Sequence, residues 1–310
     1  MTTRQPHNYD EDKIKSLSSL EHIRKRTGMY IGRIGDGRDY DDGIYILLKE
    51  ILDNAVDEFI MGYGDRIVVT LEGPRVSVRD FGRGIPLGKV IECVSRINTG
   101  AKYSNEVFQF SVGLNGIGTK AVNALSSRFE VCSHRNGEFA AAFFERGKLV
   151  EKPKGRRPDE PDGTFIRFEP DPEIFGEGAF DLDHVDRRLR YYAFLNTGLR
   201  LEFNDRVYLS KNGLLDLLRD ELDGEAIYPP LHFRSKTLEL VVTHTQRFDE
   251  TFLSFVNGQF TIDGGAHLSA FREGLVKGFN EYSKNKFEAD DIREGMAGAI
   301  AVRLQEPVFE

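Results

Sequence analysis

The sequence predicts an α+β protein built from two domains. Its 310 residues are about twice the length of a typical domain. Residues 44–61 carry apolar side chains at helical spacing, whereas residues 66–80 alternate apolar and polar side chains around Gly73-Pro74, which is typical of a β-hairpin. Because the stretch Gly224–Pro230 resembles a domain junction, we expect a first domain at 1–224 and a second at 225–310.

The elements are expected in a definite order. In the first domain they are helix 44–61, strands 66–72 and 75–80, helix 87–97, a long loop 98–112, helix 119–125, strands 128–134 and 138–146, a loop 152–162, strand 163–169, helix 183–195, a hairpin 198–209 and helix 214–222. In the second they are strands 237–245 and 252–257, helix 267–282 and strand 297–304.

Composition excludes several classes of protein. The formal net charge of −8 makes the chain a poor candidate for holding DNA unaided, because the phosphate backbone rewards concentrated positive charge. No apolar run approaches the roughly 18 residues that span a bilayer, so we expect a cytoplasmic protein without membrane contact. The only two cysteines, Cys93 and Cys132, are too few for a disulfide framework and are expected to be buried.

Three polar side chains share one face of the 44–61 helix, opposite its apolar stripe. At 100° per residue, Glu50, Asn54 and Asp57 fall within about 60° of one another. A solvated surface is the ordinary reason for such a face, and the helix alone favours it. The alternative is a site in which Glu50 is a general base and Asn54 an oxygen ligand for Mg²⁺, which commonly takes one or two protein oxygens.

Asp80 ends a predicted strand and begins the turn Asp80-Phe81-Gly82-Arg83-Gly84. Its carboxylate can accept a hydrogen bond from an amino group such as that of adenine, and the two glycines let a flat ligand approach the backbone. Turns after strands are rich in Asp and Gly for conformational reasons, so this motif alone is weak.

The stretch Gly113-Leu114-Asn115-Gly116-Ile117-Gly118 directly precedes a predicted helix. Its backbone N–H groups and the positive end of the helix dipole could bind phosphate. The spacing is not the dinucleotide fingerprint, and Thr119-Lys120 reverses the order that a P-loop requires, which excludes a Walker-type ATPase. A nucleotide with Mg²⁺ would use the helix face, the Asp80 turn and this loop together.

Together, Glu50-x-x-x-Asn54, Asp80-x-Gly82-x-Gly84 and Gly113-x-x-Gly116-x-Gly118 resemble the three nucleotide-binding motifs of the GHKL, or Bergerat, ATPases. Residues 24–32 and 121–126 and the stretch Asp263-Gly264-Gly265-Ala266-His267 are similar to the B subunits of bacterial type II topoisomerases. The resemblance covers about residues 19–310. It implies an α/β sandwich with helices on one face of a mixed sheet, followed by a transducer domain of ribosomal-protein-like βαβ fold.

The resemblance implies a role for each matching residue. Glu50 would activate the attacking water, Asn54 would ligate Mg²⁺ and Asp80 would accept a hydrogen bond from adenine. Lys102 and the loop amides would contact the phosphates, and Tyr9 would come from the N-terminal arm of a dimer partner. The full set of implied ATP contacts is Tyr9, Asn54, Asp80, Gly82, Arg83, Gly84, Ile85, Pro86, Lys102, Gly113, Leu114, Asn115, Gly116, Ile117, Gly118 and Thr164.

Residues 111–120 resemble topoisomerase IV more than gyrase, in which the position of Asn115 is usually His. The resemblance thus implies an ATP-driven dimer gate for DNA strand passage, with loop 98–112 closing over the nucleotide. The implied partners are the A subunit of topoisomerase IV, a second copy of the chain, double-stranded DNA and aminocoumarin-type inhibitors. The alternatives are the B subunit of DNA gyrase, a MutL-type repair ATPase, which would lack Met29-Tyr30-Ile31-Gly32, and a nucleotide-dependent dimerisation module without efficient turnover.

The sequence departs from the family pattern at two points, and it contains two clusters of basic residues. Ile46 stands where gyrase-type members often place a His that orients the base, and no Gln-Thr-Lys occurs in the 310 residues, so we expect slow turnover. The basic cluster, which we define as Lys152, Lys154, Arg156 and Arg157, is expected in a solvated loop, with a weak DNA contact as the alternative. Arg187, Arg188 and Arg190 are expected to be surface charges.

Overall fold

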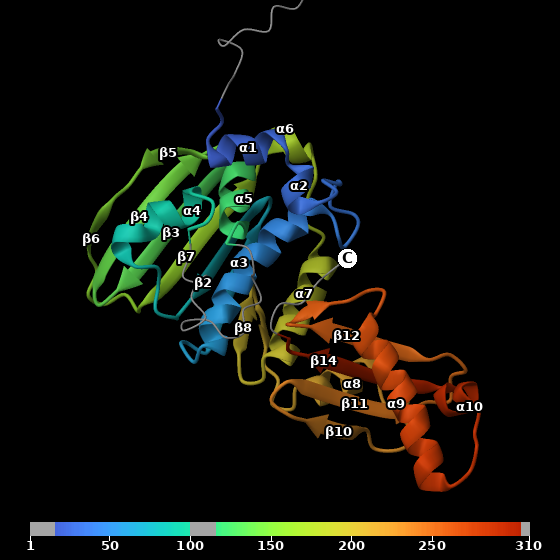
Figure 1. Ribbon diagram of the computed structural model, residues 1–310. Helices are drawn as coiled ribbons and strands as arrows, with labels where there is room; N and C mark the ends of the chain where they lie inside the picture. Colours follow the sequence, from blue (N-terminus) through green and yellow to red (C-terminus); the bar gives the residue numbers. More distant parts are fainter. Residues whose placement is uncertain (1–15, 100–115, 305–310) are drawn as a thin grey trace, which may run out of the picture.

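The computed structural model describes residues 16–99 and 116–304, which form two sheets with their covering helices (Figure 1). The larger sheet has nine strands in the order β5-β4-β3-β7-β2-β1-β8-β9, with β6 beside β4. Its neighbours are antiparallel except β1 and β8, which are parallel, so the predicted mixed sheet is confirmed. The strands are β1 Arg66–Glu72, β2 Arg75–Asp80, β3 Ser126–Arg135, β4 Glu138–Glu145, β5 Lys148–Glu151, β6 Lys154–Arg156, β7 Gly163–Pro170, β8 Arg200–Phe203 and β9 Arg206–Tyr208.

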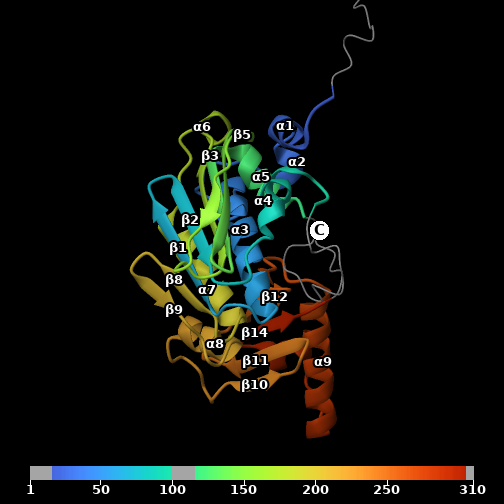
Figure 2. The ribbon, with the colours of Figure 1, turned by 90° about the vertical axis from the view of Figure 1, so that its left-hand side faces the viewer.

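Helices α3, α4 and α5 lie together on one side of the larger sheet (Figure 2). This arrangement confirms the predicted layers, because α3, α4 and α5 all contact strands of the larger sheet. The helices that precede the second sheet are α1 Ser19–Lys25, α2 Gly28–Ile31, α3 Gly43–Ile60, η2 Leu87–Lys89, α4 Val90–Ser95, α5 Gly118–Leu125, α6 Pro172–Phe175, α7 Leu182–Leu195 and α8 Leu214–Leu222.

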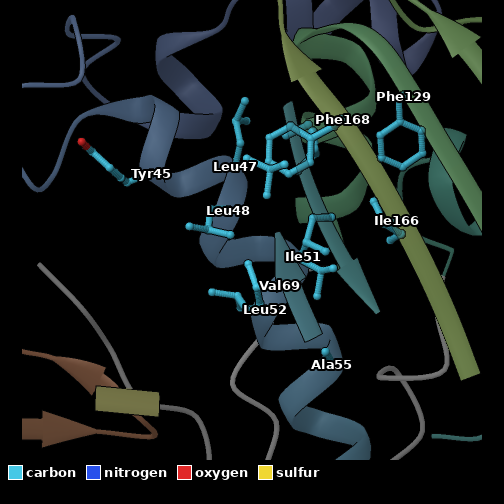
Figure 3. Packing of buried hydrophobic residues seen from close by; sticks show 14 of the residues in the cluster. Tyr45, Leu47, Leu48, Ile51, Leu52, Ala55, Val69, Phe129, Ile166 and Phe168 are labelled. Atoms are coloured by element: carbon cyan, nitrogen blue, oxygen red, sulfur yellow. The ribbon is translucent and has the colours of Figure 1, made fainter. Parts of the chain in front are cut away.

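The main core lies where α3 meets the larger sheet. Leu47, Leu48 and Ile51 of α3 face Val69 of β1 and Phe168 of β7, and each is at most 2% exposed (Figure 3). Strand alternation brings every second side chain of the sheet to this face. At roughly 1.5–3 kcal/mol for each large apolar side chain that is fully buried, this contact fixes the position of α3 on the sheet.

The smaller sheet follows α8 and has five strands in the order β10-β11-β14-β12-β13. Strands β12 and β14 are parallel and are joined through α9, which is the βαβ connection expected of the second unit. Its elements are β10 Leu231–Arg234, β11 Leu238–His244, β12 Thr251–Val256, β13 Gln259–Phe260, α9 Ala266–Ser283, α10 Ala289–Arg293 and β14 Met296–Val302.

A second hydrophobic cluster joins α7 and α8 to the smaller sheet. Leu195 of α7 and Leu217 and Leu218 of α8 pack with Val241 and Phe255 of that sheet. In its packing, α8 therefore belongs with the second unit, although it precedes residue 225. The division at 224/225 stays a prediction.

Three sequence expectations are corrected. The expected loop 152–162 contains β6, which pairs with β4 through Phe139 and Gly155. The polar face of α3 is not solvated, because Glu50 and Asn54 are half-buried and Asp57 is only 1% exposed. Arg188 is buried rather than on the surface, with its guanidinium 4.4 Å from the centre of the Tyr40 ring.

Candidate functional site

The carboxylate of Glu50 lies against the first residue of α5. A Cβ added to Gly118 would overlap Glu50 Oε2 and lie 2.9 Å from Glu50 Cβ. Only glycine therefore allows the start of α5 to approach α3 this closely. The contact joins two of the three sequence motifs, which are far apart along the chain.

Asn54 lies one helical turn after Glu50 and is held by two hydrogen bonds. Its Nδ2 donates to the Glu50 carbonyl oxygen at 2.8 Å and to Thr119 Oγ1 at 2.8 Å. Both N–H groups of the amide are thus directed at the protein, and the amide oxygen is the atom that could ligate a hard cation. Among residues 16–99 and 116–304, no group of three or more His, Cys, Asp and Glu is arranged for a metal ion.

Asp80 is buried at the end of β2, on the same face of the sheet as α3. Its register partner is Ile67, a core residue that is 1% exposed, and directly opposed residues of an antiparallel pair share a face. The backbone N–H groups of Gly82 and Thr164 donate to Asp80 Oδ1 at 3.0 and 3.1 Å. Since both of these N–H groups bind Oδ1, Oδ2 is the oxygen of the carboxylate that a ligand could engage.

Burial raises the pKa of the Asp80 carboxyl to about 6, against the hydrogen bonds from Gly82 and Thr164, which lower it. The carboxyl group therefore changes its charge near neutral pH. A perturbed carboxyl at a strand end beside a glycine turn is typical of a ligand site.

The turn after Asp80 is fixed by protein contacts on both sides. A Cβ on Gly82 would lie 2.7 Å from Glu58 Cβ, and one on Gly84, whose φ is +70°, would lie 2.7 Å from the His134 carbonyl oxygen. These two glycines thus allow the turn to lie close to α3 and β3. Ile85 packs against the core and Pro86, which is exposed, precedes η2.

Glu58 and Tyr63 contact this turn through Arg83, and sequence reasoning missed both. Glu58 Oε1 and Oε2 accept hydrogen bonds from the Arg83 guanidinium at 2.8 and 3.0 Å, and Oε2 also accepts the Arg83 backbone N–H. The Arg83 guanidinium lies 4.2 Å from the centre of the Tyr63 ring. The sequence offered one signal, which is that Glu58 and Arg83 carry opposite charges. Only the folded structure shows that α3 lies beside the turn.

Sequence reasoning also missed Lys120 and Arg135, which lie at the edges of the site. Lys120 is 4% exposed, and its Nζ donates to the carbonyl oxygens of Thr99 at 2.7 Å and Gly116 at 2.5 Å. It thus joins the two chain segments that flank residues 100–115. Arg135 Nη1 donates to the Gly84 carbonyl oxygen at 3.3 Å, which places Arg135 beside the Asp80 turn.

The structure thus brings the three motifs together along one helix. Glu50 and Asn54 contact the start of α5, and Glu58 contacts the Asp80 turn about 12 Å farther along α3. Gly116, Ile117, Gly118 and Thr164 belong to the same region, and Gly116 adopts a φ of +58°. The predicted contacts Tyr9, Lys102, Gly113, Leu114 and Asn115 lie outside the described residues.

Two family descriptions match the chain. Residues 39–174 match the "Histidine kinase-, DNA gyrase B-, and HSP90-like ATPase" family, and residues 209–310 match "DNA gyrase B". The described residues contain no helix with the length and apolarity that a bilayer crossing requires.

Among curated relatives, the B subunit of DNA topoisomerase 4 from Borreliella burgdorferi is 55% identical over 304 residues, 98% of this chain and 51% of the relative. The B subunit of DNA gyrase from Thermotoga maritima is 36% identical over 338 aligned residues, 97% of this chain and 52% of the relative. The chain spans about half the length of the curated relatives it matches.

Solved structures agree with the sequence relatives. The 43K ATPase domain of Thermus thermophilus gyrase B, solved in complex with an aminocoumarin, is 34% identical with a TM-score of 0.76, and the match covers 95% of this chain and 83% of that one. The ATPase region of Saccharomyces cerevisiae topoisomerase II, at 22% identity and a TM-score of 0.78, shares the fold. The chain belongs to the family of type II topoisomerase B subunits, and the part of them that it matches is the GHKL ATPase region.

Proposed function

We propose that this chain binds ATP with Mg²⁺ and hydrolyses it, using Glu50 as the general base. The observation that carries the proposal is the contact of Glu50 with Gly118, with Asn54 and Thr119 hydrogen-bonded beside it. Phosphoryl transfer to water needs a positioned water, a base and neutralisation of phosphate charge, so geometry supplies most of the rate. A carboxylate at the start of a glycine-flanked helix is well placed to orient such a water.

The other residues of the site fit the nucleotide. Asp80 would accept the adenine amino group through Oδ2, and Thr164 would stay beside it through its bond to Oδ1. The backbone N–H groups at Gly116, Ile117 and Gly118 and the N-terminus of α5 would hold phosphate. Arg83, Ile85 and Pro86 would form the outer edge of the adenine pocket, and Tyr9, Lys102, Gly113, Leu114 and Asn115 are proposed as further contacts.

Asn54 fits the proposed Mg²⁺, because its two amide N–H groups are held by protein acceptors and a neutral oxygen is a ligand that this cation accepts. When bound, Mg²⁺ would neutralise phosphate charge. Glu50 and Asn54 would act from one face of α3, which the core holds rigidly on the sheet.

We further propose that ATP binding closes a dimer of this chain and that the intact protein passes one DNA duplex through another in the cytoplasm, together with the A subunit of topoisomerase IV. The 55% identity to a topoisomerase 4 B subunit, against 36% for a gyrase B, favours this branch over gyrase. The aminocoumarin complex of the T. thermophilus gyrase B domain supports the proposal that this class of inhibitor binds at the Asp80 turn here too.

The test is steady-state hydrolysis of Mg²⁺-ATP by the wild-type chain and by Glu50→Gln, with Glu92→Gln in α4 as the matched control. We expect Glu50→Gln to lose about 100-fold or more in turnover while it still binds a non-hydrolysable ATP analogue, and Glu92→Gln to be unchanged. Turnover of Glu50→Gln at the wild-type rate would refute the assigned base. Analogue binding without single-turnover hydrolysis in the wild type would favour the dimerisation module.

A further inference from the structure

A cavity of about 510 Å³ opens on the face of the larger sheet opposite α3. Side chains alternate along each strand, so Val69 and Ile166 face the core while their neighbours Val68 and Phe165 line the cavity. Its volume lies within the roughly 300–1,000 Å³ of small-molecule sites. Because Asp80 faces the core side, this outer cavity is separate from the candidate nucleotide site.

The walls of the outer cavity are aromatic. Phe81, Phe139, Phe143 and Phe165 all line it, and each of them is half-buried. They come from the Asp80 turn and from strands β4 and β7, so the fold assembles the cavity from distant segments. Phenylalanine faces that are neither fully covered nor fully exposed offer stacking surfaces to a flat ligand.

Once the ion pairs of its lining residues are taken into account, the outer cavity has a positive charge, that of Arg157. Arg157 lies with its guanidinium 4.4 Å from the centre of the Phe139 ring, and no acidic side chain of the described residues forms an ion pair with it. The other charged groups of the lining are paired, Arg79 with Glu160 at 3.5 Å and Glu130 with Arg167 at 3.2 Å. An anionic group would therefore find its partner in Arg157.

Two other cations of the basic cluster lie beside the cavity but outside its lining. Lys154 and Arg156 belong to β6, which pairs with β4 directly beside Phe139, and both are exposed. Gly155 opposes Phe139 on the cavity face, so its neighbours Lys154 and Arg156, which oppose Ala140 and Glu138, point to the other face of the sheet. Of the basic cluster, Arg157 is therefore the residue that lines the cavity.

A buried histidine lines the floor. His134 is 5% exposed, and within the described chain its ring nitrogens contact only Cys132 Sγ, at 3.6 and 3.9 Å. Burial, followed by the charge of Arg79, lowers the pKa of His134 and so favours the neutral imidazole. Buried polar groups nearly always have a stronger partner than a thiol, and a polar atom on a ligand would supply one.

We propose that the outer cavity is a second small-molecule site, which takes a planar aromatic anion. Its rings would stack among Phe139, Phe143 and Phe165, its acidic group would pair with Arg157, and a polar ring substituent would meet His134. The site goes beyond the proposed ATPase function, and it lies on the far side of the sheet from Asp80.

The test uses 8-anilinonaphthalene-1-sulfonate, an aromatic sulfonate with a planar naphthalene ring system, as the probe. Its fluorescence is titrated with the whole 310-residue chain in the presence of a saturating non-hydrolysable ATP analogue. We expect saturable 1:1 binding that Arg157→Gln weakens by about fivefold or more and that Phe143→Ala weakens as well. Lys154→Gln removes a neighbouring charge outside the lining and is expected to change the affinity by less than about twofold.

Three results would overturn the proposal. Equal losses in Arg157→Gln and Lys154→Gln, with unchanged thermal unfolding, would mean diffuse attraction without a site. Probe binding that occurs without the ATP analogue but is lost in its presence would place the probe in the candidate nucleotide site. Displacement by a ten-nucleotide oligothymidylate would make the face a nucleic-acid surface. A chain that fails to bind the analogue would contradict the proposed ATPase but leave the dependence on Arg157 intact.

Discussion

Gly118, the first residue of α5, lies directly against the carboxylate of Glu50 in α3. A Cβ on Gly118 would overlap Glu50 Oε2 and lie 2.5 Å from Cδ. The proposed base therefore has its position set by a residue without a side chain. The position of Glu50 can therefore be tested by substituting Gly118.

Gly118→Ala should displace the Glu50 carboxylate and lower ATP turnover by about 100-fold, because small misplacements of a catalytic group are costly. Binding of a non-hydrolysable ATP analogue should fall much less. Gly88→Ala is the control, since a Cβ at Gly88 meets nothing within 4 Å and its φ is not positive. Steady-state kinetics and calorimetry of both variants would check this, and equal turnover in the two would contradict it.

Asp80→Asn should weaken binding of the ATP analogue by about tenfold, because the hydrogen bond from adenine would lose a charged acceptor. Glu50→Ala should change the affinity by less than about threefold, since Glu50 serves the chemical step. Isothermal titration calorimetry at a pH of about 7.5, above the pKa of Asp80, gives both dissociation constants. A larger loss in Glu50→Ala than in Asp80→Asn would reverse the roles assigned to the two carboxylates.

The pKa of Asp80 also predicts a pH dependence of stability. The carboxyl group titrates near the ordinary 3.8 in the unfolded chain and near 6 in the folded one, so between these values the folded state binds more protons. Stability from this group is therefore present below about pH 4 and is lost as the pH rises through about 6.

Asp80→Asn removes this titration. We expect the variant to be more stable than the wild type by about 1–3 kcal/mol at pH 8 and to lose that advantage near pH 4. Thermal unfolding from pH 4 to 8 measures the difference, with Asp205→Asn in the exposed turn between β8 and β9 as the control. A difference that stays constant across this range would show that the charge of Asp80 costs nothing.

Local patterns predicted most helices and strands, because helical spacing and strand alternation depend only on short segments of the sequence. The helix ending at Ile60 and the β1–β2 hairpin followed directly from such patterns. Strand β6 was missed, since its charged residues lie between Pro153 and Pro158 and resemble a loop, and only the pairing with β4 makes it a strand. Arg188 was misplaced because the segment around Tyr40, nearly 150 residues away, covers it.

The candidate site was predictable as a set of motifs but not as a set of contacts. The pattern beginning at Glu50 gave the functional side chains of α3, and the partners of these side chains depend on the fold. Glu58 reaches Arg83 across 25 residues, and Lys120 reaches Thr99 across 21. No periodicity encodes such pairs, so only the packed structure identifies them.

Tyr192 of α7 is expected to stabilise the helix that carries the site. It is 5% exposed, and its hydroxyl donates to Asp53 Oδ1, whose other oxygen accepts from Lys49 Nζ at 2.7 Å. Tyr192→Phe leaves a buried carboxylate short of a donor and should lower the free energy of unfolding by about 1–3 kcal/mol. Tyr191→Phe is the matched control, because in the described residues its ring packs on Phe255 and its hydroxyl has no hydrogen bond. Urea unfolding followed by circular dichroism would separate the two, and equal losses would mean that the bond to Asp53 contributes nothing.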